Sequence, residues 1–123
     1  MAEILVVEDY PPMALLLTRM LRKLGHRVER EFSTKGALRH ERVFEHAVLD
    51  IDLPDGDGVT LAEQLLSRRR VNSFVFFTAT KEAFTLSRAA RLGLVVNKSE
   101  GLHRLVSVIK QLERSACQTS SSP

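Results

Sequence analysis

Short, continuously apolar runs alternate with longer amphipathic stretches along this chain. Such runs are typical of strands buried on both faces, and they lie at residues 4–7, 47–49, 74–77 and 94–96. The more polar run 27–32 predicts an edge strand. Between the runs, apolar residues recur at every third or fourth position, which predicts helices over residues 11–24, 34–42, 59–70 and 81–92. A last helix is expected after Ser99, which can act as its N-cap.

Five strands that alternate with five helices indicate the α/β fold class, with a parallel sheet covered by helices on both faces. A chain of 123 residues has the size of one ordinary domain. We expect that domain over residues 1–115. Residues 116–123 are rich in serine, and we expect them to form a disordered tail or the start of a linker.

The net charge of +3 hides an uneven distribution of charge. Residues 1–18 and 43–67 contain no lysine or arginine, yet they hold nine of the 15 acidic residues. All five aspartates lie at position 9 or between positions 50 and 57. If the two segments meet in space, a mildly basic chain carries one strongly acidic site. The positive total is therefore weak evidence for nucleic-acid binding.

Polar side chains stand where the predicted strands end. Glu8 and Asp9 follow the first strand, and Asp50, Thr78 and Lys98 stand at the ends of later ones. In an open parallel sheet, ligands bind in the crevice outside the carboxyl ends of the strands. We therefore expect these side chains to converge on one site.

Several carboxylates at close range repel one another and favour a bound cation. Oxygen ligands without histidine or cysteine suit a hard ion such as Mg²⁺. A lysine ammonium and a threonine hydroxyl beside such an ion can bind a phosphoryl group through charge and hydrogen bonding. The pattern predicts a phosphoryl-accepting site in which Asp50 is the nucleophile and forms an aspartyl phosphate. Thr78 and Lys98 are the other predicted catalytic residues.

Four motifs, in this order, resemble the receiver domain of bacterial two-component response regulators. They are ILVVEDYPP with Glu8 and Asp9, VLDIDLPDGDG with Asp50, FFTAT with Thr78, and VVNKS with Lys98. The resemblance covers roughly residues 2–114. It implies a five-stranded parallel sheet of the flavodoxin-like strand order 2-1-3-4-5.

The resemblance also implies a function. A sensor histidine kinase or phosphotransfer protein would phosphorylate Asp50, with Mg²⁺ held by Glu8, Asp9, Asp50 and the backbone carbonyl of Asp52. The only chemistry implied is Mg-dependent self-phosphorylation and autodephosphorylation, so the domain is not expected to be an enzyme. The signal would pass to a downstream protein or output domain through the face formed by the fourth helix, fifth strand and fifth helix. A homodimer through the same face is a further expectation.

The chain departs from the family's pattern at three places. Ser99 follows Lys98 where the family usually has a proline after a cis bond, so we expect either a trans bond or a strained cis bond there. Val95 stands where the family usually has an aromatic residue that changes rotamer on activation. The stretch from Thr78 to Lys98 is about two residues shorter than is common. We expect the shortening between the fourth helix and the fifth strand.

A further set of positions is expected to modulate the chemistry: Asp52, Ala79, Thr80, Val95 and Ser99. Asp52 lies two residues beyond Asp50, where the resemblance implies control over the lifetime of the phosphate. A carboxylate there could orient the hydrolytic water or add repulsion. Ala79 is small and should leave the pocket open to a partner histidine and to water.

Other functions stay open on the sequence alone. Asp50-Ile51-Asp52 resembles the Asp-x-Asp motif of haloacid-dehalogenase-type phosphatases, although in those enzymes the nucleophile follows the first strand. A receiver-like interaction module with altered switching is a second alternative, because Val95 and Ser99 depart from the pattern. Direct nucleic-acid binding is not expected, since the chain has no helix-turn-helix pair and no aromatic stacking platform.

The remaining polar residues have structural interpretations. Asp55 and Asp57 lie in a stretch dense in turn residues and are interpreted as turn and cap residues. The four histidines show no metal-ligand spacing and are interpreted as surface groups: His26, His40, His46 and His103.

Three features bear on location. No apolar run approaches the length of a membrane span, and the first residues lack the basic region of a signal peptide. The single cysteine, Cys117, suits a reducing compartment. Together these features predict a cytoplasmic protein without membrane contact.

Overall fold

The computed structural model describes residues 1–121, with the side chains of residues 1–115. Within that range the central sheet is parallel and has the order β2-β1-β3-β6-β7. Its strands are β1 (Glu3–Val7), β2 (Arg27–Glu31), β3 (Phe44–Leu49), β6 (Val71–Thr78) and β7 (Gly93–Asn97). This order confirms the expected flavodoxin-like fold. Its switch point, where a ligand crevice is expected, lies between β1 and β3.

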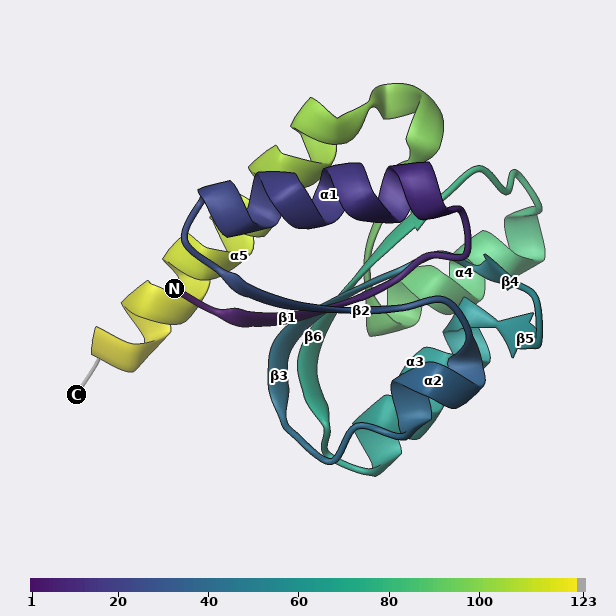
Figure 1. Ribbon diagram of the computed structural model, residues 1–123, viewed down its shortest axis with the longest axis horizontal. Coiled ribbons are helices and arrows are strands. Elements are labelled where there is room, and N and C mark those ends of the chain that lie inside the picture. The colour runs from purple at the N-terminus through teal and green to yellow at the C-terminus, as the bar shows by residue number, and fades with distance from the viewer. Residues whose placement is uncertain (122–123) are drawn as a thin grey trace.

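Helices cover both faces of the sheet (Figure 1). They are α1 (Pro11–Lys23), α2 (Thr34–Leu38), α3 (Gly58–Ser67), α4 (Ala83–Leu92) and α5 (Leu102–Ser121), with a 3-10 turn, η1 (Lys98–Glu100), before α5. Side chains alternate between the faces along each strand. Ile4 and Val6 therefore pack with α1 and α5, whereas Leu5 and Val7 pack with α2, α3 and α4. The two resulting cores hold the strand ends rigidly at the edge where the polar residues stand.

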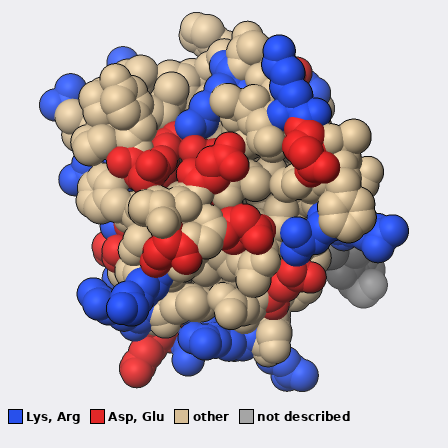
Figure 2. Space-filling view, turned by 90° about the vertical axis from the view of Figure 1, so that its right-hand side faces the viewer, with Lys and Arg blue, Asp and Glu red and all other residues tan. Residues whose placement is uncertain are grey.

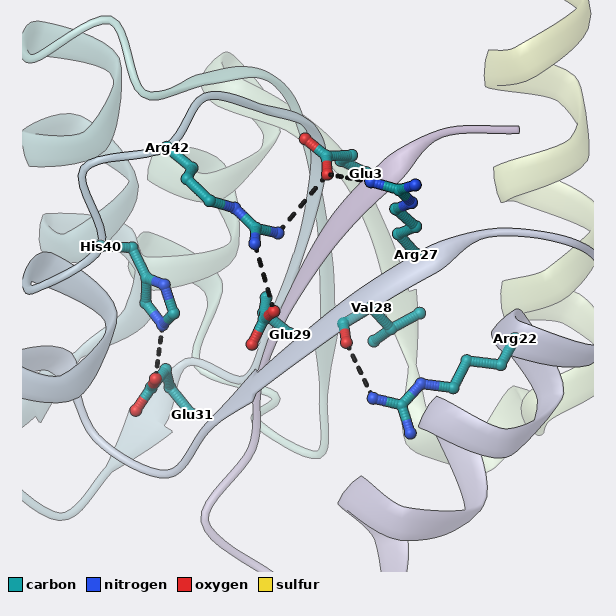
Figure 3. Close-up of polar contacts among 8 residues, drawn as sticks. All are labelled: Glu3, Arg22, Arg27, Val28, Glu29, Glu31, His40 and Arg42. Carbon is teal, nitrogen blue, oxygen red and sulfur yellow. Dashed lines mark hydrogen bonds and ion pairs between the residues drawn. The ribbon is translucent and has the colours of Figure 1, made fainter.

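Charged side chains line the sheet edge at β2. Arg42 lies between Glu3 of β1 and Glu29 of β2, with nitrogen–oxygen distances of 3.5 and 3.4 Å (Figure 3). Arg22 of α1 donates a hydrogen bond to the Val28 carbonyl at 3.0 Å. Charges on an edge strand oppose pairing with another sheet. The edge position of β2 is confirmed and accounts for its polar sequence.

Two element predictions are wrong in detail. Residues 53–58 are dense in turn residues, which predicts a loop, but this part of the chain contains a two-stranded antiparallel hairpin, β4 (Asp52–Leu53) and β5 (Gly56–Asp57). The second helix ends at Leu38 instead of Arg42. Beyond it, His40 contacts Glu31 and Arg42 contacts the charges on β1 and β2, so the chain has left the helical path before β3 begins.

Ser99 is not the N-cap of the last helix. The Asn97 side chain accepts a hydrogen bond from the Ser99 amide at 2.9 Å, and the Glu100 side chain accepts one from the Asn97 amide at 2.7 Å. This capping box starts η1, and α5 begins only after Gly101, whose φ is +86°. The sequence pattern misplaced the cap because Asn97 and Ser99 are both favoured capping residues.

The last helix is also longer than expected. Residues 116–121 are helical and continue α5, whereas we expected a disordered tail or the start of a linker over residues 116–123. The final two residues of that predicted tail, 122 and 123, lie outside the described residues. The domain limit at residue 115 stays a prediction.

Two of the histidines are not surface groups. The side chains of His46 and His26 are only 5% and 9% exposed. His46 points from β3 into the face covered by α5, where it lies 3.7 Å from Glu113. A lone histidine in an alternating strand gives no sign of what covers it, so this burial was not predictable from spacing.

The α4–β7 junction is unusually close. Leu92 ends α4 and Gly93 begins β7, so no residue connects them, and this is where we expected the shortening. A Cβ atom on Gly93 would lie 2.2 Å from the Phe74 carbonyl oxygen. Only glycine allows β7 to approach β6 this closely directly after a helix.

Among the described residues, no helix is both long enough and apolar enough to cross a membrane.

Candidate functional site

Three carboxylates meet beyond the two central strands. Glu8 and Asp9 follow β1, and Asp50 follows its neighbour β3. The Asp50 amide donates to the Val7 carbonyl at 3.0 Å, which extends the pairing of the strands to the site. One carboxylate oxygen from each residue lies within 4.8 Å of the others. The two segments without basic residues therefore do meet, as the strand-end argument predicts.

The charge distribution follows this arrangement. Figure 2 views the side of the molecule that carries the β4–β5 hairpin and the start of α1 in Figure 1. Acidic side chains gather in the middle of this face, and most lysine and arginine side chains lie around its rim. On this face, basic side chains thus surround an acidic centre, and a cation is attracted to that centre.

Lys98 reaches this centre from the end of β7. Its Nζ lies 2.9 Å from Asp50 Oδ2 and 2.7 Å from Glu8 Oε1. The carboxylate side chains are only 7% and 4% exposed, and that of Lys98 is 23% exposed. Removing water strengthens such ion pairs. The convergence of Lys98 and Asp50 on one site was expected, with Lys98 binding the phosphoryl group. The contact with Glu8 was missed, because the sequence assigned Glu8 to the metal alone.

The close packing of charges shifts two pKa values. Burial and the charge of Asp50 raise the pKa of Glu8, even though Lys98 acts in the opposite direction. Burial by itself would lower the pKa of Lys98, but its hydrogen bonds to Glu8 and Asp50 outweigh burial and raise it. Lys98 is therefore charged at neutral pH. The raised pKa of Glu8 shows that one ammonium only partly compensates the carboxylates.

Thr78 is the last residue of β6 and is fully buried. Its hydroxyl oxygen accepts a hydrogen bond from the Thr80 amide at 3.2 Å, which leaves the hydroxyl proton available to donate. Ala79 is exposed and Thr80 half-buried, so the chain turns outward directly after Thr78. These three residues lie at the same edge of the sheet as Asp50 and Lys98.

The β4–β5 hairpin begins at Asp52, whose backbone lies beside Asp50 and whose carboxylate lies outside the acidic group. The Asp52 amide lies 3.4 Å from Asp50 Oδ1, but its exposed carboxylate is not among the three grouped with Glu8. The hairpin returns the chain to Gly58, where a Cβ atom would lie 2.0 Å from the Asp50 carbonyl oxygen. Gly58 is thus required for the backbone to pass directly behind Asp50.

Asp55 and Asp57 have capping roles. Asp57 is the N-cap of α3 and accepts hydrogen bonds from the Thr60 amide and hydroxyl, both at 2.8 Å. Asp55 accepts from the amides of Thr34 and Lys35 at 2.8 and 3.0 Å. This second set of bonds ties the hairpin to the first turn of α2, about twenty residues away in sequence.

The two departures near Lys98 are visible in the structure. No cis peptide bond occurs among the described residues, so the Lys98–Ser99 bond is trans. Ser99 is exposed. Val95 is half-buried and packs against the core shared with α3 and α4. Valine has no aromatic ring, so the rotamer change of the family's usual aromatic residue cannot occur at this position.

The donor set of the acidic centre fits Mg²⁺. Glu8, Asp9 and Asp50 offer only carboxylate oxygens, which a hard divalent cation prefers. Their ligand atoms are within 4.8 Å of one another, and the charge on Glu8 is incompletely compensated. A divalent cation here would stabilise the ionised form of Glu8 against burial and the charge of Asp50, which together raise its pKa.

The sheet is parallel and doubly wound, and carboxylates and a lysine gather beyond the ends of its strands. These features define a class of small α/β domains that bind a charged ligand at the switch point. Within this class, residues 4–110 match the family model described as the response regulator receiver domain. The chain belongs to this family and is a receiver domain of a two-component response regulator.

Individual relatives agree with this assignment. The Fimbriae Z protein of Salmonella typhimurium is 25% identical over 117 residues, which cover 90% of this chain and 56% of that protein. The chain therefore spans about half the length of this curated relative.

Solved structures give the same result. The non-phosphorylated HemR receiver domain from Leptospira biflexa is 29% identical, with a TM-score of 0.82 over 91% of this chain and 94% of that one. The response regulator protein TrrA from Thermotoga maritima, in complex with Mg²⁺ and BeF, is 23% identical, with a TM-score of 0.80 over 91% of this chain and 99% of that one.

Proposed function

We propose that this domain accepts a phosphoryl group on Asp50 from a histidine kinase or phosphotransfer protein. The observation that carries the proposal is the position of Lys98 Nζ, 2.9 Å from Asp50 Oδ2 and 2.7 Å from Glu8 Oε1. A cation held against a buried carboxylate would stabilise the negative charge on a transferred phosphoryl group.

The reaction is a transfer between two nucleophiles. A carboxylate oxygen of Asp50 bonds to the phosphorus as the phosphorus–nitrogen bond of the donor phosphohistidine breaks. The imidazole leaves with that electron pair and takes up a proton. Lys98 would move from the carboxylates to a phosphoryl oxygen, and the Thr78 hydroxyl would donate to another. In this proposal Asp50 is the nucleophile, and Thr78 and Lys98 stabilise the negative charge on the phosphoryl oxygens.

Glu8, Asp9 and Asp50 would hold Mg²⁺, with the Asp52 carbonyl as a further ligand. The ion, when bound, neutralises part of the charge on the phosphoryl oxygens. The complex of TrrA with Mg²⁺ and BeF supports this assignment by fold similarity. Asp52, Ala79, Thr80, Val95 and Ser99 would tune access and phosphate lifetime.

Intact mass spectrometry tests the proposal. The full chain is incubated with Mg²⁺ and a small phosphodonor, such as acetyl phosphate, in parallel with Asp50→Asn. We expect the wild type to gain the mass of one phosphoryl group and Asp50→Asn to gain none. An unmodified wild type at saturating donor would contradict the proposal, and so would equal modification of both proteins.

We further propose that the domain signals and is not an enzyme with free turnover. Phosphorylation should be stoichiometric, whereas a haloacid-dehalogenase-type phosphatase would continuously hydrolyse a free phosphate ester. The signal would be delivered in the cytoplasm, to a downstream protein or an output domain. The expected contact face includes the exposed Phe84 of α4 and Leu94 of β7, and a homodimer would use the same face.

A further inference from the structure

A second group of titratable side chains lies at the opposite end of β3 from Asp50. Glu45 and His46 stand in the first half of β3, and Glu113 stands in the second half of α5. Each offers one ligand atom, and the three atoms lie within 4.8 Å of one another. In Figure 1, the second half of α5 lies on the side of the molecule away from the β4–β5 hairpin. The group is therefore separate from the acidic centre.

One ring nitrogen of His46 is bonded and the other is not. Nδ1 lies 2.5 Å from the Ser73 hydroxyl, which lies 3.4 Å from the Glu45 carbonyl oxygen. When the hydroxyl donates to this carbonyl, Nδ1 must donate to the hydroxyl, and Nε2 of the neutral ring then carries a lone pair. Among the residues with described side chains, His46 Nε2 and Glu113 Oε1 are both buried without a hydrogen-bond partner.

These two unpartnered atoms face each other. His46 Nε2 is 3.7 Å from Glu113 Oε1. An unsatisfied acceptor is costly to bury, and two acceptors that face each other are worse. His26 Nδ1 is 3.6 Å from the same oxygen, but it already accepts a hydrogen bond from the Ala2 amide at 3.0 Å.

The separation of the two atoms favours a metal ion over a proton. A charge-assisted hydrogen bond would bring nitrogen and oxygen to about 2.7–2.9 Å. Two ligands of a tetrahedral Zn²⁺, each about 2.0–2.2 Å from the ion, lie about 3.3–3.6 Å apart. The observed distance of 3.7 Å between His46 Nε2 and Glu113 Oε1 is within a few tenths of an ångström of the distance between two zinc ligands. It is much longer than a charge-assisted hydrogen bond.

We propose that His46 Nε2, Glu113 and Glu45 bind a divalent transition-metal ion of the Zn²⁺ type at the amino end of the sheet. One imidazole and two carboxylates suit Zn²⁺, and water can complete the tetrahedron. The Ser73 hydroxyl would fix the tautomer of His46, as an outer-shell partner does. The ion would join the start of β3 to α5.

Zinc binding by the full chain tests this proposal. Zn²⁺ is titrated by calorimetry in excess Mg²⁺, which occupies the oxygen-only acidic centre. All proteins carry Cys117→Ser, so that the thiol cannot bind the metal. We expect one Zn²⁺ per chain and a shift of the His46 Nε2 resonance in ¹⁵N spectra at constant pH. His103→Gln, which removes an exposed histidine of α5, is the matched control and should bind as the parent does.

Three variants probe the ligands. His46→Gln and Glu113→Gln should each abolish this binding, while circular dichroism shows that the variants are folded. Glu113 is more exposed than His46, so its substitution tests the site even if His46→Gln misfolds. Ser73→Ala should weaken binding by about 10-fold or more, as outer-shell changes do. Unchanged zinc affinity in Glu113→Gln would overturn the proposal. A His46 resonance that moves with pH but not with Zn²⁺ would also overturn it, and would assign the pair to a proton.

Discussion

Lys98 lies between two buried carboxylates that the chain supplies from its first and third strands. The ammonium compensates part of the negative charge of the two carboxylates. The raised pKa of Glu8 indicates that this compensation is incomplete. Such a site favours the binding of an additional cation. The lysine can also leave one anionic partner and bind another. Both properties suit a domain whose ligand is a phosphoryl group.

The raised pKa of Glu8 makes Mg²⁺ binding dependent on pH. The folded chain keeps a proton on Glu8 at pH values where the unfolded chain, with its ordinary pKa of 4.5, has lost it. The contribution of Glu8 to stability therefore falls as the pH rises from 4.5 through the raised pKa. Mg²⁺ binds the ionised carboxylate and offsets this loss. We expect the rise in melting temperature caused by Mg²⁺ to be small near pH 4.5 and to grow toward neutral pH.

Glu8→Gln is the control for this prediction. Glutamine cannot ionise, so in the absence of Mg²⁺ the melting temperature of this variant should fall less as the pH rises. Its response to Mg²⁺ should also be smaller, because one of the ligands has lost its charge. A Mg²⁺ effect of equal size in both proteins at every pH would contradict the assignment of Glu8 as a ligand.

At the scale of elements, the start of α3 positions Asp50 from behind. A Cβ atom on Gly58 would lie 2.0 Å from the Asp50 carbonyl oxygen, which is backbone and cannot rotate away. We expect Gly58→Ala to lower the free energy of unfolding by about 1–3 kcal/mol, as overpacking does. Urea denaturation measures this change.

Gly56→Ala, in the hairpin that leads to Gly58, is the matched control. Its Cβ atom would have Thr34 Cγ2 as nearest neighbour at 3.4 Å, which is ordinary contact. We expect a change of about 0.5 kcal/mol or less. If both alanine variants lose the same stability, the loss belongs to the hairpin as a whole and not to the approach of Gly58 to Asp50.

The N-cap of α3 links this helix to acid stability. The hydrogen bonds from Thr60 to Asp57 outweigh the effect of burial and lower the pKa of Asp57. Its contribution is therefore present above the ordinary aspartate pKa of 3.8 and is lost as the pH falls through the lowered value. We expect Asp57→Ala to cost about 1 kcal/mol at neutral pH.

An asparagine at position 57 distinguishes the effect of the capping hydrogen bonds from the effect of the aspartate charge. Asp57→Asn keeps a good capping oxygen and should cost little at neutral pH. It should also remove part of the stability loss in acid, because it has no proton to gain. Chemical denaturation of both variants at neutral and acidic pH measures these effects. An alanine variant as stable as the wild type at neutral pH would show that the cap contributes nothing.

For the whole molecule, the two cores set how much of the chain is needed. Among the described side chains of α5, those of residues 102–115, the buried hydrophobic ones are Leu105, Val108 and Ile109. A chain that ends after residue 115 keeps all three and should unfold within about 1 kcal/mol of the full chain. A chain that ends after residue 107 lacks the last two and should lose about 3 kcal/mol or more. Thermal and urea denaturation compare the three lengths. A large loss on removal of residues 116–123 would extend the domain past residue 115.

Prediction from sequence worked best where the signal is local. Apolar runs such as Ile4–Val7 predict buried strands by themselves, and residues that directly follow a strand must lie at its end. For this reason Glu8, Asp50 and Lys98 could be placed at one edge before any contact was known. The caps were harder, since Ser33, Asn97 and Ser99 are equally favourable capping residues by type, and backbone geometry decides among them.

By itself, the sequence determined the α/β class, the parallel sheet and the convergence of the acidic segments with Lys98. Those features depend on periodicity and on chain order, which are properties of the sequence. Only the tertiary structure decided that Lys98 pairs with Glu8 as well as Asp50, that Asp55 caps a helix from a distant hairpin, and that His46 faces Glu113. Each of these is a contact between residues far apart along the chain, set by how helices pack on the sheet, and no local pattern records it.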